Sequence, residues 1–464
     1  MGISDDARFR APLRPREFRH AAEVLLMTPS ARLSAAIEVL ADIDARRRPA
    51  TDVLKDWGIS HRFAGSGDRA AIAGLVYDAL RRKSSSAALM GEGTPRAVLL
   101  GMLRRERKLD TAAIGALCGG ARFAPAPLTQ AETSALERDS LAGVPAYVEG
   151  DYPDWLDPHL TRVFGDERAE EGAALASRAP LDLRVNLLAG TRDEVLPKLG
   201  HLEATATRWS PIGIRIRLSP DAKSPAIHAE PVFLKGLIEI QDEGSQLAAL
   251  LADAKPGEQV VDLCAGAGGK TLALSAAMEN RGQIYSTDID KRRLAPIHER
   301  IARAGARNVQ MRTPATARGG ADVLADLAGR ADLVMIDAPC TGTGAWRRNP
   351  DAKWRIRPGA LAERIKEQDE ALERAGALVK PGGRIAYVTC SILAEENGDR
   401  VQAFLAGHPE FSVEKPADLV NVPGERAYLF RRAVLMSEEG LLMTPRRTDT
   451  DGFFVSLLRR RSSS

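Results

Sequence analysis

Two cysteines and one aspartate each follow a short apolar run that is typical of a buried strand. Asp337 ends the run Leu333–Ile336, and Cys340 lies three residues further along the chain. Cys390 follows the run Arg384–Val388. A thiolate is a strong nucleophile that can form a covalent intermediate, and a nearby acid can stabilise the charge that such an addition creates. Because cysteine is mostly protonated at pH 7, this chemistry requires a local field that favours the thiolate.

A further strand-like run, Val260–Leu263, leads into a glycine-rich turn and then into a helix-like segment. Backbone N–H groups at such a turn point towards a ligand above the end of the strand. The segment fails as a phosphate-binding P-loop, because Cys264 stands where the first glycine is required. It also fails as a dinucleotide fingerprint, because Thr271 replaces the last glycine. A glycine turn without any ligand is the simplest alternative.

S-adenosylmethionine (SAM) fits this turn better, because it requires close approach of the backbone and carries no phosphate. It also requires an acid at the end of the next strand to hold its ribose hydroxyl groups. The run Gln283–Thr287 predicts that strand, and Asp288 follows it about 20 residues beyond the turn. We therefore predict a SAM site.

Methylation of a pyrimidine base is a reaction that would use both the cysteine thiols and a methyl donor. Carbon 5 of the ring is a poor nucleophile, and a thiolate that adds to carbon 6 activates it by making the ring enamine-like. An acid near ring nitrogen 3 stabilises the charge that this addition creates. Asp337 and Cys390 fit this chemistry, with Cys340 on the same loop as Asp337. Oxygen and exocyclic nitrogen acceptors need no thiol, and for them the cysteines would be incidental.

The elements that must position these residues alternate between strand-like and helix-like over the C-terminal half, with Gly452–Leu458 as the last strand. This alternation predicts a parallel sheet with helices on both faces and with ligands outside the carboxyl ends of the strands. Gly266, Asp288, Asp337 and Cys390 all fall at such ends. The convergence of four strand ends is the main argument for an α/β fold.

The N-terminal part of the chain is predicted to be a small all-helical domain. Leu33, Ile37 and Leu40 have helical spacing behind Ser30, a possible N-cap. Further segments with this periodicity are Ala70–Arg82, Val98–Leu103 and Thr111–Leu117.

A small α+β module is predicted between the helices and the SAM site. Alternating apolar residues indicate strands at Leu181–Leu187 and Ile212–Ile216, and Thr191 begins a capped helix between them. Three arginines on these strands could face RNA or solvent: Arg184, Arg215 and Arg217.

Composition limits the class of protein. A length of 464 residues suggests two or three domains, and the net charge of +3 is nearly balanced. The four cysteines form no C-x-x-C pair, which argues against a zinc site and a disulfide framework. Neither a long apolar run nor an apolar signal core is present. We expect a cytoplasmic monomer with no metal and no membrane span.

These motifs together resemble the RsmB/Sun (Fmu) family of RNA 5-methylcytosine methyltransferases, over roughly residues 152–460. The matching segments are Ile240–Gln246, Cys264–Thr271, Asp337–Cys340, Thr389–Ser391, Glu395–Asn397 and Asp451–Phe454. The helical segment, with Asp68-Arg69 and Leu75-Val76-Tyr77, is similar to the NusB-like domain of the rRNA-modifying members.

The resemblance implies an α/β fold: a Rossmann-like SAM-dependent methyltransferase domain preceded by a small α+β module and an all-helical NusB-like domain. The implied division is a basic disordered arm (1–28), a NusB-like RNA-binding domain (29–122), a linker (123–150), an α+β RNA-binding module (151–235) and the methyltransferase domain (236–464).

The resemblance also implies roles for individual residues. Cys390 would add to carbon 6 of a cytosine in RNA, with 16S rRNA as the expected substrate, and Cys340 would help to release the methylated base. Asp337 would contact the cytosine and the methionine end of SAM. The implied cofactor contacts are Cys264, Ala265, Gly266, Ala267, Gly268, Gly269, Lys270, Asp288, Arg293 and Asp337.

The chain departs from the family pattern at two places. The family writes its loop Cys-Ala-Ala-Pro-Gly-Gly-Lys, whereas Gly266 and Ala267 replace the Ala-Pro pair here. The family also has an aspartate after the third strand to bind the adenine amino group, and none occurs around Arg312–Pro314. The Gly266-Ala267 pair predicts a looser turn, and the missing aspartate predicts a lower affinity for SAM.

The loop Thr341–Trp354 is expected to contact RNA phosphates through Arg347, Arg348 and Lys353, and Trp346 or Trp354 could stack on a base or pack in the core. Three alternatives stay open. Cys340 could be the nucleophile, the substrate could be a tRNA, or the protein could be a ribosome-assembly factor with weak or lost activity.

Overall fold

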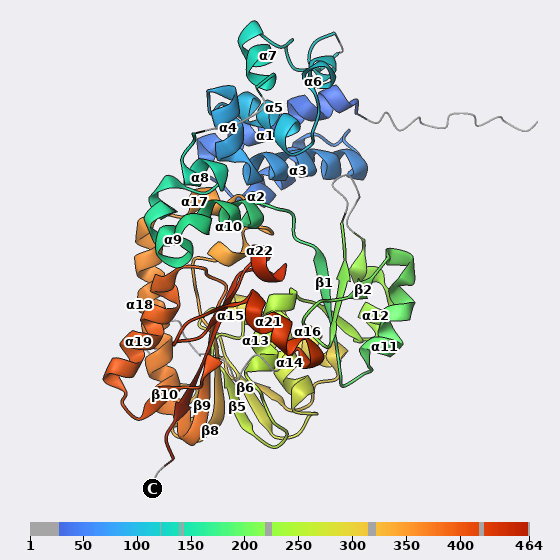
Figure 1. The fold of residues 1–464 in the computed structure, drawn as a ribbon. Helices are drawn as coiled ribbons and strands as arrows, with labels where there is room; N and C mark the ends of the chain where they lie inside the picture. The colour runs from blue at the N-terminus through green and yellow to red at the C-terminus, as the bar shows by residue number, and fades with distance from the viewer. Residues whose placement is uncertain are drawn as a thin grey trace, which may run out of the picture.

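The computed structural model describes residues 27–120, 122–138, 141, 143–218, 225–313, 322–416 and 422–462 (Figure 1). The arm expected at residues 1–28 lies outside these ranges except for its last two residues. The described chain forms a helical domain, a small antiparallel sheet with short helices, and a large sheet covered by helices. This order agrees with the predicted one, while the likeness of the helical domain to NusB stays a prediction.

Within the described residues, the large sheet has nine strands in the order β11-β12-β13-β9-β8-β5-β6-β7, with β10 paired to β13. Strands β5 to β9 are parallel, whereas β13 is antiparallel to β9. The prediction of a fully parallel sheet is therefore wrong at this edge. A short connection from β12 leads into β13, and such connections join antiparallel neighbours, whereas a parallel pair requires a long crossover. The strands are β5 (Gln259–Asp262), β6 (Gln283–Ser286), β7 (Val309–Met311), β8 (Ala331–Asp337), β9 (Val379–Thr389), β10 (Phe411–Val413), β11 (Leu435–Met436), β12 (Leu441–Met443) and β13 (Phe453–Arg460).

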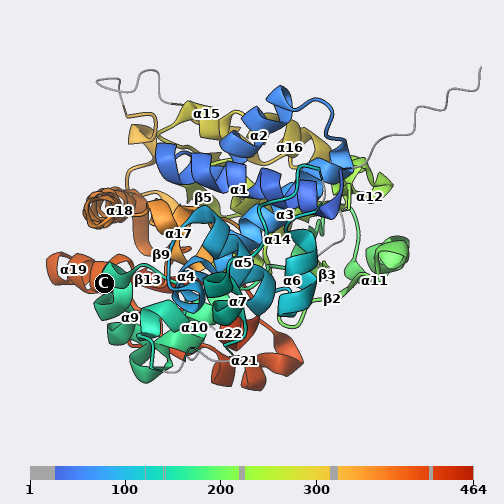
Figure 2. The same ribbon diagram turned by 90° about the horizontal axis from the view of Figure 1, so that it is seen from above.

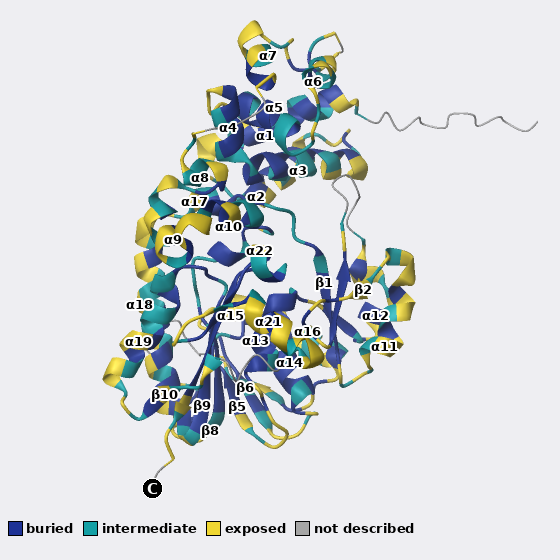
Figure 3. Ribbon diagram, viewed as in Figure 1, coloured by how far each residue is buried: buried dark blue, intermediate teal, exposed yellow. Residues whose placement is uncertain are grey.

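Helices cover both faces of this sheet, as predicted, and its central strands are buried (Figure 3). Successive strand residues face opposite sides, so Ile336 packs in the core beneath α18 and α19, and Met335 packs in the core beneath α13 and α14. The helices are α13 (Glu243–Leu251), α14 (Gly269–Ala277), α15 (Lys291–Leu294), α16 (Ile297–Ala304), α17 (Ala352–Arg355), α18 (Pro358–Leu378), α19 (Gly398–Gly407), α21 (Ala427–Ala433) and α22 (Pro445–Thr448).

The strand order brings the predicted site residues to one edge. Strand β5 lies between β6 and β8. After β5 the chain adds β6 and β7 on one side of it, and then crosses over to add β8 and β9 on the other side. Sheets of this kind bind ligands at such a switch point, outside the carboxyl ends of the strands. The segments that follow β5, β6, β8 and β9 carry Cys264, Asp288, Asp337 and Cys390.

The small sheet has the order β2-β3-β1-β4 and is antiparallel. It contains both predicted strands, and β4 adds a strand beyond residue 235, where we expected the module to end. Helices α9 and α10 precede this sheet, but they pack into the core of the large sheet through Leu160 and Leu175. The elements are α9 (Asp157–Phe164), α10 (Arg168–Leu175), β1 (Leu181–Val185), α11 (Arg192–Val195), β2 (Thr205–Ala206), β3 (Gly213–Ile216), α12 (Pro231–Leu234) and β4 (Ile238–Ile240).

Two of the three arginines on this sheet are buried against the domain that contains the large sheet rather than facing RNA or solvent. Arg215 is 4% exposed, and it donates to Asp182 at 2.7 and 2.8 Å and to Asp449 at 2.8 Å. Arg184 is also buried. Only Arg217 has an exposed side chain, which contacts Asp449 at 3.3 Å. The alternating pattern could not distinguish these cases, because the partners of Arg215 come from distant segments.

The helical domain overlies the large sheet when it is viewed from above (Figure 2). The four predicted helices are α1, α3, α5 and α6, but Thr28 rather than Ser30 caps α1, by accepting a hydrogen bond from Ala31 N. Ala135 and Leu136 of α7 belong to the same apolar core, so helical packing continues into the segment expected to be a linker. The helices are α1 (Pro29–Arg46), α2 (Ala50–Ser60), α3 (Ser66–Arg81), α4 (Lys83–Met90), α5 (Pro95–Arg105), α6 (Thr111–Leu117), α7 (Gln130–Leu136) and α8 (Ala146–Glu149).

The end of α3 is hydrogen-bonded to the segment around α17. Lys353 Nζ donates to Arg81 O at 3.1 Å, and Trp354 Nε1 donates to Leu80 O at 2.6 Å. Lys353 is 1% exposed. Its predicted contact with RNA phosphate is therefore wrong, because its ammonium group lies in the interface between the helical domain and the large sheet.

The two neighbouring arginines of this loop are also structural. Arg347 is 2% exposed and contacts Asp451 at 3.2 Å. Arg348 contacts Asp451 at 2.5 Å and Asp242 at 2.8 Å. Trp346 is 1% exposed and packs in the core. The prediction that Arg347 and Arg348 contact RNA phosphates is therefore wrong, since both guanidinium groups pair with carboxylates of this protein, and of the two roles predicted for Trp346 the structure shows packing.

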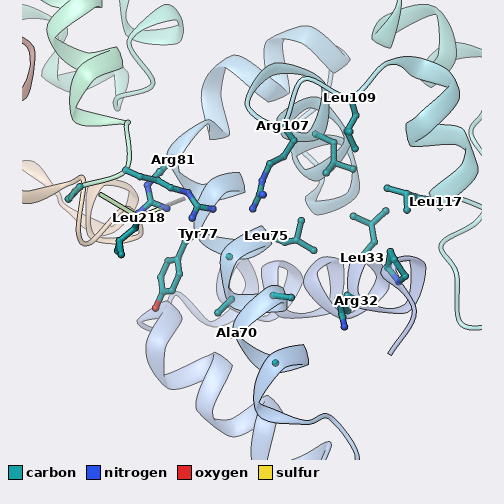
Figure 4. Close-up of a pocket in the computed structure, with 18 residues that line it drawn as sticks. Arg32, Leu33, Ala70, Leu75, Tyr77, Arg81, Arg107, Leu109, Leu117 and Leu218 are labelled. Atoms are coloured by element: carbon teal, nitrogen blue, oxygen red, sulfur yellow. The ribbon is translucent and has the colours of Figure 1, made fainter. Parts of the chain in front are cut away.

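A cavity of about 1010 Å³ lies beside the helical domain (Figure 4). Arg81 and Arg107 line it together with Leu33, Leu75 and Leu109. Among the described residues, none of those predicted to bind SAM or to react contributes to its wall. This cavity is therefore separate from the edge of the sheet where the site residues meet.

None of the helices within the described ranges has both the length and the apolar character needed to cross a bilayer.

The pH dependence of stability tests the buried lysine at the interface. Burial lowers the pKa of Lys353 from 10.5 to about 7. Between these values the unfolded chain binds more protons than the folded one, so the free energy of unfolding rises with pH. We predict that from pH 7.5 to 8.5 it rises by up to about 1.4 kcal/mol more in the wild type than in Lys353→Met. Urea unfolding at several pH values measures this difference, and parallel pH profiles would contradict it.

Candidate active site

The two cysteines predicted to react lie side by side. Cys340 Sγ and Cys390 Sγ are 3.4 Å apart, and both side chains are half-buried. They follow the neighbouring parallel strands β8 and β9. Gly344 N donates to Cys390 O at 2.9 Å, so the two segments are also joined through their main chains. A substrate atom that reaches one sulfur is therefore close to the other.

A buried carboxylate holds the two cysteine segments together. Glu396 is fully buried and accepts hydrogen bonds from Thr341 N at 2.8 Å and from the Ser391 hydroxyl group. Thr341 and Ser391 each directly follow one of the cysteines. Gln368 of α18 donates to the same carboxylate at 3.1 Å. The sequence placed Glu396 within a family motif but indicated no role for it, because its partners are distant in the chain.

An ion pair connects the cysteine segments to the glycine turn. Lys270 Nζ donates to Asp337 Oδ2 at 2.7 Å. Lys270 is in the first turn of α14, directly after the glycines, and Asp337 ends β8. The Lys270 side chain is 7% exposed, whereas that of Asp337 is 36% exposed. Asp337 therefore still presents surface to a substrate while it is held from the cofactor side.

The glycine turn has the conformation that its sequence predicts. Gly266 and Gly268 have φ values of +51° and +81°. A Cβ atom on Gly268 would lie 2.3 Å from Ile297 Cγ1, so glycine is required where the turn packs on α16. Gly266 N donates to Asp288 Oδ2 at 3.0 Å, and Arg293 lies 3.9 Å from the same oxygen. The turn and the acid after β6 are thus adjacent, as predicted.

Two arginines that the sequence did not place at the cofactor site contact the carbonyl groups of this turn. Arg300 Nη1 donates to Ala267 O at 2.7 Å, and Arg184 Nη1 donates to Gly269 O at 2.8 Å. Arg300 comes from α16 and Arg184 from β1 of the small sheet. Hydrophobic periodicity carries no information on such contacts.

Burial affects two of the thiols at this site. The hydrogen bond with Cys390, together with burial, raises the pKa of Cys340. Burial also raises the pKa of Cys264. A protonated Cys340 can donate to the Cys390 sulfur, 3.4 Å away.

The strand ends fit a cofactor that carries polar groups and a flat base. Asp262 Oδ1 and Thr287 Oγ1 are buried, and neither has a hydrogen-bond partner in the part of the chain that the structure describes. Burial raises the pKa of Asp262 to about 7, although the Thr271 hydroxyl group, which donates to its other oxygen, opposes this shift. Ile289, next to Asp288, is 88% exposed and offers an apolar face to a purine. SAM has the groups that match these features.

Arg312, in the segment where the family has an adenine-binding aspartate and this chain has none, is paired within the protein. Its guanidinium group pairs with Asp326 at 3.1 Å and lies 5.1 Å from the centre of the Tyr285 ring. Pro314 lies outside the described residues. In the described ranges, no group of three or more His, Cys, Asp or Glu side chains could hold a metal ion.

Comparisons with known families and sequences identify the family of this chain. The family model for 16S rRNA methyltransferase RsmB/F matches residues 249–459. A model for the RsmF/B-like ferredoxin-like domain matches residues 152–222. The chain is 30% identical to a probable ribosomal RNA small subunit methyltransferase B of Synechocystis sp., over 67% of each chain. It is 32% identical to ribosomal RNA small subunit methyltransferase B of Sodalis glossinidius, over 66% of this chain and 65% of that protein. The alignments thus span about two thirds of the length of these relatives.

Solved structures show the same architecture. The crystal structure of PH0851 has a TM-score of 0.66 and 25% identity, covering 94% of this chain and 100% of that one. A methyltransferase homolog protein from Pyrococcus horikoshii has a TM-score of 0.55 and 27% identity, covering 69% of this chain and 99% of that one.

The fold, the glycine turn and the acid after β6 define a Rossmann-like, SAM-dependent methyltransferase. Within this class, the chain belongs to the RsmB/F family of 16S rRNA methyltransferases. The individual roles of its cysteines and acids are not tested by these likenesses and stay predictions.

The hydrogen bonds of Glu396 to Thr341 and Ser391, called the clamp below, can be tested by substitution. Glu396→Gln replaces an acceptor-only carboxylate with an amide that cannot accept from all its donors, so the cysteines should shift relative to each other. We predict that kcat for methyl transfer falls by about 10²-fold, while the affinity for SAM is unchanged. Rates with RNA and calorimetry with SAM measure the two effects.

Glu395→Gln is the matched control for this substitution. Glu395 is the preceding residue, but its carboxylate contacts His159 at 2.8 Å, away from both cysteine segments. If both variants keep wild-type rates, the clamp has no part in catalysis.

Proposed function

We propose that the protein transfers a methyl group from SAM to carbon 5 of a cytosine in RNA, with Cys390 as the nucleophile and 16S rRNA as the substrate. The observation that carries this proposal is the pair of sulfurs 3.4 Å apart, beside an aspartate that is bound to the cofactor turn. Methylation of oxygen or of an exocyclic nitrogen would need no such pair.

Cys390 begins the reaction by adding to carbon 6 of the ring. The neighbouring Cys340 thiol supports the reactive form, because an S–H donor 3.4 Å away stabilises a thiolate. The new bond joins Cys390 Sγ to carbon 6 and leaves carbon 5 electron-rich. The target base must be unstacked or single-stranded to reach these groups.

Asp337 recognises the edge of the ring. With one oxygen held by Lys270, its other oxygen can accept a hydrogen bond from the exocyclic amino group of cytosine. The Lys270 ammonium group, 2.7 Å from this carboxylate, helps to stabilise the charge that the addition creates on the ring. Lys270 adds a positive charge on the cofactor side of the same carboxylate.

The cofactor would be held by the turn from Cys264 to Lys270 and by Asp288, with Arg293 beside that acid. SAM bound there supplies an electrophilic methyl carbon for carbon 5.

Release of the product requires a base, solvent water or the neighbouring Cys340 sulfur, to take the proton on carbon 5, while the bond between carbon 6 and Cys390 breaks and its electron pair returns to the Cys390 sulfur. Cys340 is the group beside the departing sulfur, where it can hydrogen-bond the thiolate as the bond breaks. Removal of Cys340 should therefore slow the second half of the reaction more than the first.

Single substitutions separate these two roles. We predict that Cys390→Ala lowers methyl transfer by about 10⁴-fold or more without changing SAM affinity. Cys340→Ala should instead accumulate a covalent protein–RNA adduct, visible as a band of lower mobility on a denaturing gel. An adduct formed by Cys390→Ala but not by Cys340→Ala would make Cys340 the nucleophile. Calorimetry that detects no SAM binding, alone or with RNA, would favour a ribosome-assembly factor.

The RNA substrate is tested in cells. Bisulfite sequencing of total RNA from strains with and without this gene should show the loss of one 5-methylcytosine signal in 16S rRNA. Its loss in a tRNA, with 16S rRNA unchanged, would contradict the proposed substrate.

A further inference from the structure

The cofactor turn is held from outside the methyltransferase sheet. Ala267 O accepts from Arg300 at 2.7 Å, and Gly269 O accepts from Arg184 at 2.8 Å. Both carbonyl groups belong to the segment Cys264–Lys270, which is predicted to bind SAM. Charge-assisted hydrogen bonds of this length fix the orientation of the peptide groups that they contact.

The small sheet in turn holds both arginines. Glu239 of β4 is 2% exposed and accepts from Arg300 Nη2 at 2.8 Å and from Arg303 at 2.5 Å. Arg184 pairs with Glu239 in the strand register and donates to Gln241 Oε1 at 2.9 Å. Burial lowers the pKa of Arg184 to about 10, and Glu239 opposes this shift. The turn is thus connected by two side chains to a sheet that contains no residue of the predicted SAM site.

These contacts occur where the chain departs from its family. The family loop has an Ala-Pro pair at the positions of Gly266 and Ala267, and proline fixes φ near −65° without any tertiary contact. Glycine and alanine leave the backbone freer, so holding one conformation costs more entropy. An external contact on the Ala267 carbonyl restricts the peptide group that follows the Cα atom of residue 267, whereas a proline there would restrict φ of the same residue.

We propose that Arg300 and Arg184 are positioning residues for the SAM turn, and that Arg300 replaces the restraint that proline provides in the family loop. This inference rests on the proposed SAM site. It makes cofactor affinity depend on the small sheet, because Glu239 and Gln241 hold the two arginines.

A matched pair of variants tests the role of Arg300. Arg300→Ala and Arg303→Ala each remove one partner of Glu239 and leave the other, but only Arg300 contacts the turn. We expect Arg300→Ala to raise the Kd for SAM by about tenfold, measured by calorimetry, and Arg303→Ala to leave it within about twofold. Equal values of Kd for the two variants would overturn the proposal.

Restoring only the family proline provides a rescue. Introducing Ala267→Pro into Arg300→Ala keeps Gly266 at its φ of +51° and should recover most of the lost affinity, whereas the same change in Arg303→Ala should alter the affinity little. A gain in affinity that is equal in both backgrounds would show that the proline acts independently of Arg300, contrary to the proposal.

Hydrogen–deuterium exchange provides a readout without SAM. Amides of residues 264–272 should exchange faster in Arg300→Ala than in Arg303→Ala, and equal exchange would overturn the proposal even if the rescue variants fail to fold. If the wild-type protein binds no SAM, while the two variants still differ in exchange, the proposed function is contradicted and the role of Arg300 in holding the turn stands.

Discussion

The site depends on one buried carboxylate. Glu396 accepts hydrogen bonds from the residues that follow Cys340 and Cys390, and so joins two loops that the chain separates by 50 residues. A buried carboxylate is costly unless its hydrogen bonds are satisfied, and Glu396 obtains its donors from both loops and from α18. Because these donors satisfy it only when the loops are adjacent, the same interaction that stabilises Glu396 also sets the distance between the sulfurs.

A second set of contacts connects this pair to the cofactor. The Lys270–Asp337 ion pair spans the switch point between β5 and β8, which is where the fold leaves room for a ligand. On the far side of the turn, Arg184 and Arg300 link it to the small sheet. The helical domain is attached to the same assembly through Lys353 and Trp354, after the Cys340 loop. The small sheet thus contacts the glycine turn, and the helical domain contacts the segment that follows the Cys340 loop.

Much of this arrangement could be predicted from local patterns. The glycine turn, Asp288, Asp337 and Cys390 follow apolar runs, and the carboxyl ends of parallel strands meet at one edge. The sequence could not reveal which charges lie inside. Arg347 and Lys353 look like RNA contacts because their partners, Asp451 and the carbonyl of Arg81, are more than 100 residues away. The direction of β13 was missed for a related reason, since its pairing depends on the connection from β12.

The central claim is that the sulfur of Cys390, rather than that of its neighbour, attacks the ring. RNA transcribed with 5-fluorocytidine should trap the covalent adduct in the wild-type protein, because fluorine at carbon 5 cannot leave as a proton does. Trypsin separates the two sulfurs into peptides 331–347 and 385–400. Mass spectrometry should find the nucleotide on peptide 385–400, and a nucleotide on peptide 331–347 would contradict the account.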